Sequence, residues 1–177
     1  MRSGAGPAGG PPVTQPQPSP NGSAASIGMG EIRVARDGGT LRTFLGSCVG
    51  LVLLERRRRL AGVAHIVLPD SRGQGQPPGK YADTAVPETL RLLRELAGGE
   101  MLHLTAKIAG GAKMLPFQQG QTIGEQNIVA VERLLAAEGI AIVARCCGGE
   151  HGRRLVVDVA TGVVTVETVG GAAGTVM

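Results

Sequence analysis

The stretch that decides the fold is LRTFLGSCVGLVLLERRRRLAGVAHIVLP, residues 41–69. It holds two apolar runs, 43–54 and 60–69, which are separated by the charged segment 55–59. Apolar runs on both sides of a charged turn are typical of a hairpin or a tight strand pair. The small residues Gly46-Ser47-Cys48 predict a bend inside the first run, where the backbone is exposed. We therefore expect a pair of strands at the centre of the fold, with a bend near its start.

Further strands and two helices are predicted around this pair. Alternating polar and apolar residues predict a half-buried strand at 31–36. One helix is predicted to be capped by Asp83 or Thr84 and to end at Gly98-Gly99, and a second amphipathic helix to span 127–138. Further strands are predicted over residues 102–109, 140–145, 154–159 and 163–169. This order indicates an α/β fold of the mixed α+β kind, with a mixed sheet or sheet pair flanked by helices.

Length and composition indicate one folded domain behind a tail. A chain of 177 residues is long enough for a single domain with a hydrophobic core. Residues 1–27 are rich in proline, glycine, serine and glutamine and carry almost no large apolar side chains. Such a segment buries too little surface to offset its ordering entropy, so we predict a disordered tail. Residues 28–177 are predicted to form the domain.

Charge and aromatic content argue against several classes of protein. The net charge is only +4, and the aromatic content of 2% leaves few side chains on which nucleic-acid bases could stack, so no nucleic-acid binding is expected. The longest uncharged apolar stretch, 43–54, is too short to span a bilayer, and the first residues lack the apolar segment of a secretory signal. The three cysteines form no disulfide framework. We expect a cytoplasmic protein without membrane insertion.

The sequence predicts no cofactor and no metal site. The loop that contains Gly110-Gly111 fits neither of the two glycine patterns that bind phosphates. Cys146, Cys147 and His151 match no standard zinc spacing. The arginines at 56–59 are interpreted as solvated surface, although their field could steer an acidic partner.

Cys48 and His65 are the candidate pair for chemistry. A cysteine attacks as the thiolate, which near neutral pH needs a basic partner or local positive potential. His65 lies in the second apolar run, and its side chain could meet Cys48 if the two strands are neighbours. Backbone amides at the bend could donate to an oxyanion. The alternative stays open, because a lone cysteine or histidine in an apolar strand is usually a core residue.

Several motifs in order resemble the CheD family of chemoreceptor glutamine deamidases. They are TFLGSCVG, AGVAHIVLPDS, PPGKYADTAV, KIAGGAKM, IGEQN and GGEHGRR, and they cover essentially residues 29–170. The resemblance implies an α/β sandwich similar to that of bacterial toxin deamidases. It also implies a Cys–His–Thr triad in which Cys48 is the nucleophile and His65 the base. Thr43 is the implied third member, with Thr40 as a nearby competitor.

The resemblance further implies the reaction and its participants. The enzyme would be a protein-glutamine glutaminase that converts glutamines on the cytoplasmic helices of chemoreceptors to glutamate, releases ammonia and so acts in adaptation. Amides near Ser47 and Cys48 would hold the oxyanion. Lys80 and Tyr81 would shape the substrate groove, although packing and capping are equally compatible roles.

Two alternatives remain at this stage. Members of the family also bind CheC-type phosphatases, so the chain could be a chemotaxis adaptor that binds receptors or such a phosphatase without catalysis. A Cys–His peptidase or a transglutaminase-like enzyme would use the same pair of residues.

Overall fold

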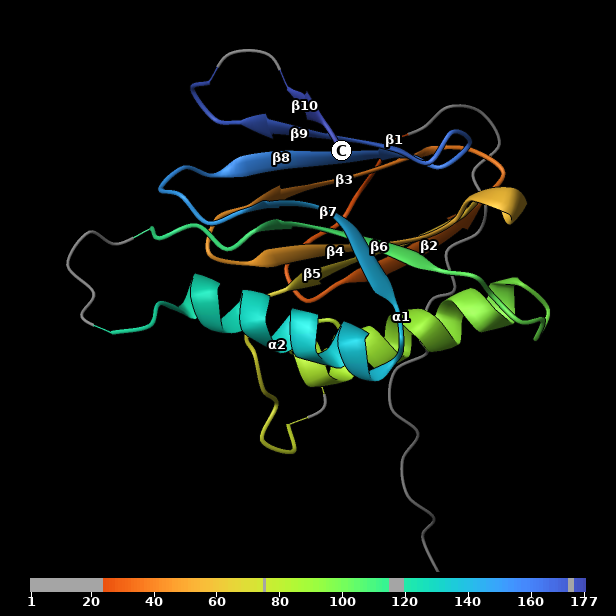
Figure 1. The fold of residues 1–177 in the computed structure, drawn as a ribbon, viewed down its shortest axis with the longest axis horizontal. Helices are drawn as coiled ribbons and strands as arrows, with labels where there is room; N and C mark the ends of the chain where they lie inside the picture. Colours follow the sequence, from red (N-terminus) through yellow and green to blue (C-terminus); the bar gives the residue numbers. More distant parts are fainter. Residues whose placement is uncertain (1–23, 75, 115–119, 172–173) are drawn as a thin grey trace, which may run out of the picture.

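Two β-sheets and a pair of helices form three stacked layers in the described part of the chain (Figure 1). The structure is a computed structural model that describes residues 24–74, 76–114, 120–171 and 174–177. The outer sheet has the strand order β1 (Ala24–Ser26), β3 (Thr40–Leu45), β8 (Arg153–Asp158), β9 (Val163–Thr168) and β10 (Thr175–Val176). The inner sheet has the strand order β2 (Ile32–Arg36), β5 (Leu60–Ile66), β4 (Val49–Glu55), β6 (Thr105–Gly110) and β7 (Ala141–Cys147). One face of the inner sheet packs on the outer sheet, and helices α1 (Ala82–Leu96) and α2 (Ile123–Ala137) cover its opposite face.

Both sheets are mixed. In the outer sheet β1 runs parallel to β3, and in the inner sheet β6 runs parallel to β7. The remaining neighbouring strands are antiparallel. This arrangement confirms the predicted fold class, a mixed α+β sandwich flanked by helices.

The predicted central hairpin is confirmed as β4 and β5. The two strands are antiparallel, and the arginine-rich turn between them forms a short 3-10 helix, Arg56–Arg58. Every residue of both strands is buried, because the inner sheet is covered by helices on one face and by the outer sheet on the other. Strands covered on both faces are continuously apolar instead of alternating, as this stretch is.

The alternate residues of β4 divide between two cores. Val49, Leu51 and Leu53 pack with the helices. Val52 and Leu54 pack against the outer sheet, where inward-facing residues of β3 and β8 meet them. This division matters for the site, because it identifies which side chains enter the layer between the two sheets.

The start of α1 differs from the prediction. The helix begins at Ala82, and the residue before it, Tyr81, makes no capping hydrogen bond with its side chain. The predicted capping by Asp83 or Thr84 is therefore wrong. Asp83 instead accepts hydrogen bonds from the backbone and side chain of Ser71, at 3.0 and 2.7 Å, and the Thr84 hydroxyl donates to the Pro78 carbonyl at 2.7 Å. Both side chains tie the preceding loop to the helix instead of capping it.

Helix α2 begins four residues before the predicted start at 127. Thr122 and Glu125 form a capping box, in which the Thr122 hydroxyl accepts from the Glu125 amide while the Glu125 carboxylate accepts from the Thr122 amide. Gly124 lies inside the first turn, where only a glycine fits, because a Cβ at this position would lie 2.4 Å from the Gly111 carbonyl oxygen. The close approach brings the beginning of α2 under the end of β6.

Residues at the end of the predicted tail take part in the fold. Ala24–Ser26 form β1, and Ile27 is buried between the sheets with 3% of its surface exposed. Residues 1–23 lie outside the described residues, so the predicted tail and domain boundary stay predictions. None of the helices in the described segments is long and apolar enough to cross a membrane.

Candidate active site

Cys48 and His65 lie on the same face of the inner sheet. Gly50 pairs directly with His65 across the β4–β5 hairpin. Cys48 directly precedes the first paired residue of β4, Val49, so extending the register by one residue makes it the diagonal neighbour of His65. Cys48 packs with the core cluster between the sheets, and His65 bonds to a residue of the outer sheet, so both side chains enter that layer. Diagonal neighbours on one face are about 7–8 Å apart at their Cα atoms, within reach of an imidazole ring.

A hydrogen bond across the two sheets orients His65. The Thr43 Oγ1 lies 2.7 Å from the His65 Nδ1, and the same hydroxyl donates to the Ile27 carbonyl oxygen at 2.8 Å. Thr43 and His65 are both buried, with 1% and 4% of their surface exposed. The imidazole ring is therefore held from its Nδ1 side by residues of the outer sheet and of the segment that follows β1.

The tautomer of His65 follows from counting hydrogens. A threonine hydroxyl has one hydrogen, and a carbonyl oxygen can only accept. Because the Thr43 hydrogen goes to Ile27, we assign the hydrogen of the Thr43–His65 bond to Nδ1 of the imidazole. The Nε2 of a neutral His65 then carries the lone pair, and this nitrogen can accept a proton.

Burial favours the neutral forms of both members of the pair. Burial raises the pKa of the Cys48 thiol, and its own backbone amide offsets part of that rise. Burial also lowers the pKa of His65, while the Ile27 carbonyl and the Glu31 carboxylate act in the opposite direction. A neutral thiol must give up its proton when it attacks, and a neutral imidazole on the same face of the sheet is a group that can accept that proton.

The segment that carries Cys48 is pinned to the end of β6. The Gly111 amide donates to the Cys48 carbonyl oxygen at 2.8 Å, and the Ala112 amide donates to the Gly46 carbonyl at 2.8 Å. Gly110 has a φ of +100°, and a Cβ there would lie 2.2 Å from the Cys48 carbonyl oxygen. A glycine is required here for two reasons, the left-handed backbone and the close approach.

Gly110→Ala is expected to destabilise the fold by about 2 kcal/mol or more, because it adds left-handed strain and a backbone clash together. Urea unfolding measures the loss. Gly139→Ala is the matched control, since Gly139 also has a positive φ, +68°, but a Cβ there would meet no atom within 4 Å. The control should lose only about 1 kcal/mol. If both variants lose the same free energy of unfolding, the added Cβ at position 110 does not clash with the Cys48 carbonyl oxygen to any measurable extent.

Of the other predicted site residues, Ser47 lies next to Cys48, whereas Thr40 lies away from His65. Thr40 lies three residues before Thr43 on β3, hence on the opposite face of the strand, away from His65. Ser47 lies in the bend beside Cys48. Tyr81 is only 4% exposed and its hydroxyl donates to Gln74 at 3.2 Å, while the Lys80 ammonium lies 5.2 Å from the Tyr81 ring centre. Lys80 and Tyr81 follow β5, and the Lys80 carbonyl accepts from the amides of Val67 and Leu68.

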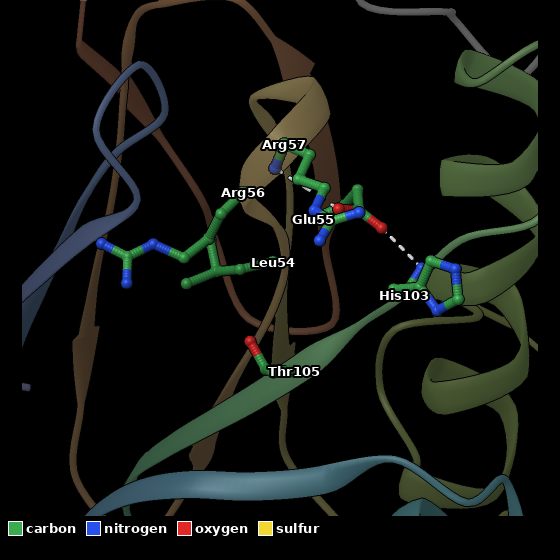
Figure 2. A pocket seen from close by; sticks show the side chains of 6 residues that line it. All are labelled: Leu54, Glu55, Arg56, Arg57, His103 and Thr105. Atoms are coloured by element: carbon green, nitrogen blue, oxygen red, sulfur yellow. Dashed lines mark hydrogen bonds between the residues drawn. The ribbon is translucent and has the colours of Figure 1, made fainter.

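A pocket at the other end of β4 is a separate feature (Figure 2). It is lined by Leu54, Glu55, Arg56, Arg57, His103 and Thr105. Seven residues of extended strand, about 23 Å, separate Glu55 from Cys48. The Glu55 carboxylate already accepts from the backbone amides of Arg57 and His103, as the dashed lines in Figure 2 show. Nothing in the described segments groups three or more histidine, cysteine or acidic side chains as a metal ion would need.

One member of this site was not predicted from the sequence. Ile27 is the last residue of the predicted tail, yet its backbone carbonyl accepts the Thr43 hydrogen and so determines the tautomer of His65. A backbone carbonyl has no sequence signature. The available signal was that Ile27 is the first large aliphatic residue after a long polar segment.

Comparison with known proteins finds one family. The family described as CheD chemotactic sensory transduction matches residues 67–168. A protein from Thermotoga maritima named chemoreceptor glutamine deamidase CheD is 40% identical over 146 residues, which cover 82% of this chain and 92% of that protein. Proteins named probable chemoreceptor glutamine deamidase CheD are also similar. The one from Methanococcus vannielii is 42% identical over 79% of this chain and 92% of its own length, and the one from Symbiobacterium thermophilum is 44% identical over 82% and 92%.

Proposed function

The chain belongs to the CheD family, and on that premise we propose that it is a deamidase that converts glutamine side chains of chemoreceptors to glutamate. The proposed substrates are the cytoplasmic helices of these receptors, which places the protein in the cytoplasm. The proposed catalytic residues are Cys48, His65 and Thr43. The observation that carries the proposal is the Thr43–His65 hydrogen bond on the face of the sheet that Cys48 shares.

Acylation is the first half of the proposed reaction. The Nε2 of His65 takes the proton of the Cys48 thiol, and the sulfur attacks the carbonyl carbon of the glutamine amide. The negative charge on the amide oxygen is held by backbone amides at the Ser47–Cys48 bend. The imidazolium then gives its proton to the amide nitrogen, the C–N bond breaks and ammonia leaves. A thioester on Cys48 remains.

Deacylation returns the enzyme to its starting state. The neutral His65 takes a proton from water, and the hydroxide equivalent attacks the thioester carbon. When the tetrahedral intermediate collapses, the C–S bond breaks and the sulfur recovers a proton from the imidazolium. The product is glutamate on the receptor. Thr43 acts through His65, because its oxygen keeps the hydrogen on Nδ1 and the lone pair on Nε2.

Ammonia release from a purified receptor cytoplasmic fragment tests the proposed function. We expect release that depends on the enzyme and is accompanied by glutamate at defined glutamine positions. Tight binding of the fragment without ammonia would instead favour an adaptor that holds receptors or a CheC-type phosphatase. Backbone cleavage would reveal a peptidase, and incorporation of an added primary amine would reveal a transglutaminase.

Thr43→Val is expected to lower kcat by about 10- to 100-fold, because the ring loses the oxygen that fixes its tautomer and orientation. Thr43→Ser keeps the hydroxyl and is the matched control, so it should stay close to the wild-type rate. Steady-state ammonia release measures both. If the valine variant works as fast as the serine variant, Thr43 has no part in orienting His65.

A further inference from the structure

Asn127 connects the two segments that carry Cys48 and His65. It lies in the second turn of α2 and is fully buried, with 0% of its surface exposed. Its side-chain nitrogen donates to the Ser47 carbonyl at 3.2 Å and to the Val67 carbonyl at 2.9 Å. Ser47 precedes Cys48 directly, and Val67 follows the end of β5, two residues after His65. One amide group thus joins the bend and the strand end.

The residue type suits this connection. An amide nitrogen has two hydrogens, so it can serve two carbonyl acceptors at once. An aspartate of the same shape has no hydrogen to donate when ionised, and glutamine is one methylene longer. The Asn127 oxygen, however, has no hydrogen-bond partner among the described residues. Burying an unpaired acceptor costs free energy, so an asparagine here is not explained by stability alone.

The contact with Ser47 also sets the direction of the Cys48 amide. In a trans peptide the carbonyl and the following N–H point in opposite directions. Asn127 comes from the helix layer, so the Ser47 carbonyl points toward the helices and the Cys48 N–H points toward the layer between the sheets. The Cys48 thiol enters that same layer. The amide is therefore directed to the side on which an oxyanion would form.

We propose that Asn127 is a positioning residue, which fixes the Ser47–Cys48 peptide and ties it to the end of the strand that carries His65. The inference rests on the proposed function and deepens it, since it assigns the side chain that fixes the position of the proposed nucleophile, Cys48, relative to the proposed base, His65. The role is exerted through the two carbonyls, and Asn127 touches no reacting atom.

The test compares Asn127→Leu with Val131→Ala. Leucine has a similar shape and cannot donate, so both carbonyls lose their partner. Val131 lies one turn further along α2 and is fully buried in the helix-side core, which includes neither Ser47 nor Cys48, so its truncation controls for lost stability. Asn127→Ser, with a single hydroxyl hydrogen, is the second variant should the leucine variant fail to fold. Thermal unfolding establishes that each protein is folded at the assay temperature.

Two rates are measured for each variant. The first is the rate at which iodoacetamide alkylates Cys48 in the folded protein, measured by mass spectrometry of the peptide that contains Cys48. This measurement needs no receptor. The second is ammonia release from a receptor fragment. We expect alkylation and kcat of the Asn127 variants to fall about 10- to 100-fold with KM little changed, and Val131→Ala to keep both rates. A fall in kcat alone also supports the proposal and assigns the effect to the Cys48 amide.

Rates of the Asn127 variants that match those of Val131→Ala would overturn the inference. Failure of the proposed function has a different signature. In that case the wild-type protein releases no ammonia, while the alkylation rates still decide whether Asn127 positions Cys48.

Discussion

Cys48→Ala is expected to reduce ammonia release to background, a loss of about 10⁴-fold or more, because it removes the sulfur that forms the thioester in the proposed reaction. The variant should stay folded, since it removes one sulfur from a partly buried position. Ammonia release from a receptor fragment and thermal unfolding of the same preparation measure the two effects.

Cys147→Ala is the matched control for the loss of a thiol. Burial raises the pKa of Cys147 to about 11, and the side chain packs on the helix side of the inner sheet, away from the layer that holds Cys48. The control should keep wild-type activity. Residual turnover by Cys48→Ala at a substantial fraction of the wild-type rate would remove Cys48 from the proposed mechanism.

His65→Ala is expected to have the second largest effect, a fall in kcat of about 10²- to 10⁴-fold, which is the usual contribution of a positioned general base. Because burial raises the pKa of Cys48, the thiol is protonated near neutral pH and depends on His65 to lose its proton. The rate at which iodoacetamide alkylates Cys48 should therefore fall as well. An unchanged alkylation rate at neutral pH would show that the thiol is activated by another group.

The pH dependence of kcat/KM of the wild-type protein is an independent test of the proposed role of His65 as the base. The neutral imidazole is the active form, and burial lowers its pKa. The neutral form therefore persists to lower pH than for an exposed histidine, and the acid limb of kcat/KM should have its midpoint below about 6.5. His65→Ala should lack this limb.

The central hairpin could be predicted because its sequence indicates both the burial of its two strands and the solvent exposure of the turn between them. The two runs are continuously apolar, which matches strands covered on both faces, and the arginines between them can only lie at a solvated turn. The strands predicted at 31–36, 102–109, 140–145, 154–159 and 163–169 also match β2, β6, β7, β8 and β9 to within a few residues, whereas the short edge strands β1 and β10 were not predicted. Helix starts were harder, because they depend on which side chain accepts from the first amides. The sequence prediction starts α2 at 127 although Thr122 and Glu125 have the spacing of a capping box, because Gly124 favours a loop.

The relation of Cys48 to His65 could not be derived from periodicity. The bend at 46–48 interrupts the strand pattern, so the face on which Cys48 lies depends on the register of β4 with β5 and on the bonds from Gly111 and Ala112. The third partner was open between Thr40 and Thr43 for a similar reason. The two threonines lie on opposite faces of β3, and only the packing of the outer sheet on the inner one brings Thr43 to His65.

The groups that hold the pair in place gave almost no signal in the sequence. Ile27 contributes a backbone carbonyl, and Asn127 contributes an amide from a helix eighty residues beyond Ser47 in the chain. Such contacts arise from the stacking of layers, which no local pattern encodes. They are nevertheless the features that turn a cysteine and a histidine in apolar strands into a candidate active site.

The most direct test of the proposed function is the intact mass of a receptor cytoplasmic fragment after incubation with the wild-type protein and with Cys48→Ala, followed by peptide mapping. We expect the fragment treated with wild type to gain the mass difference between glutamine and glutamate at defined sites, and the fragment treated with Cys48→Ala to keep the mass of the untreated fragment. An unchanged mass with wild type, or an equal gain with both proteins, would contradict the proposed function.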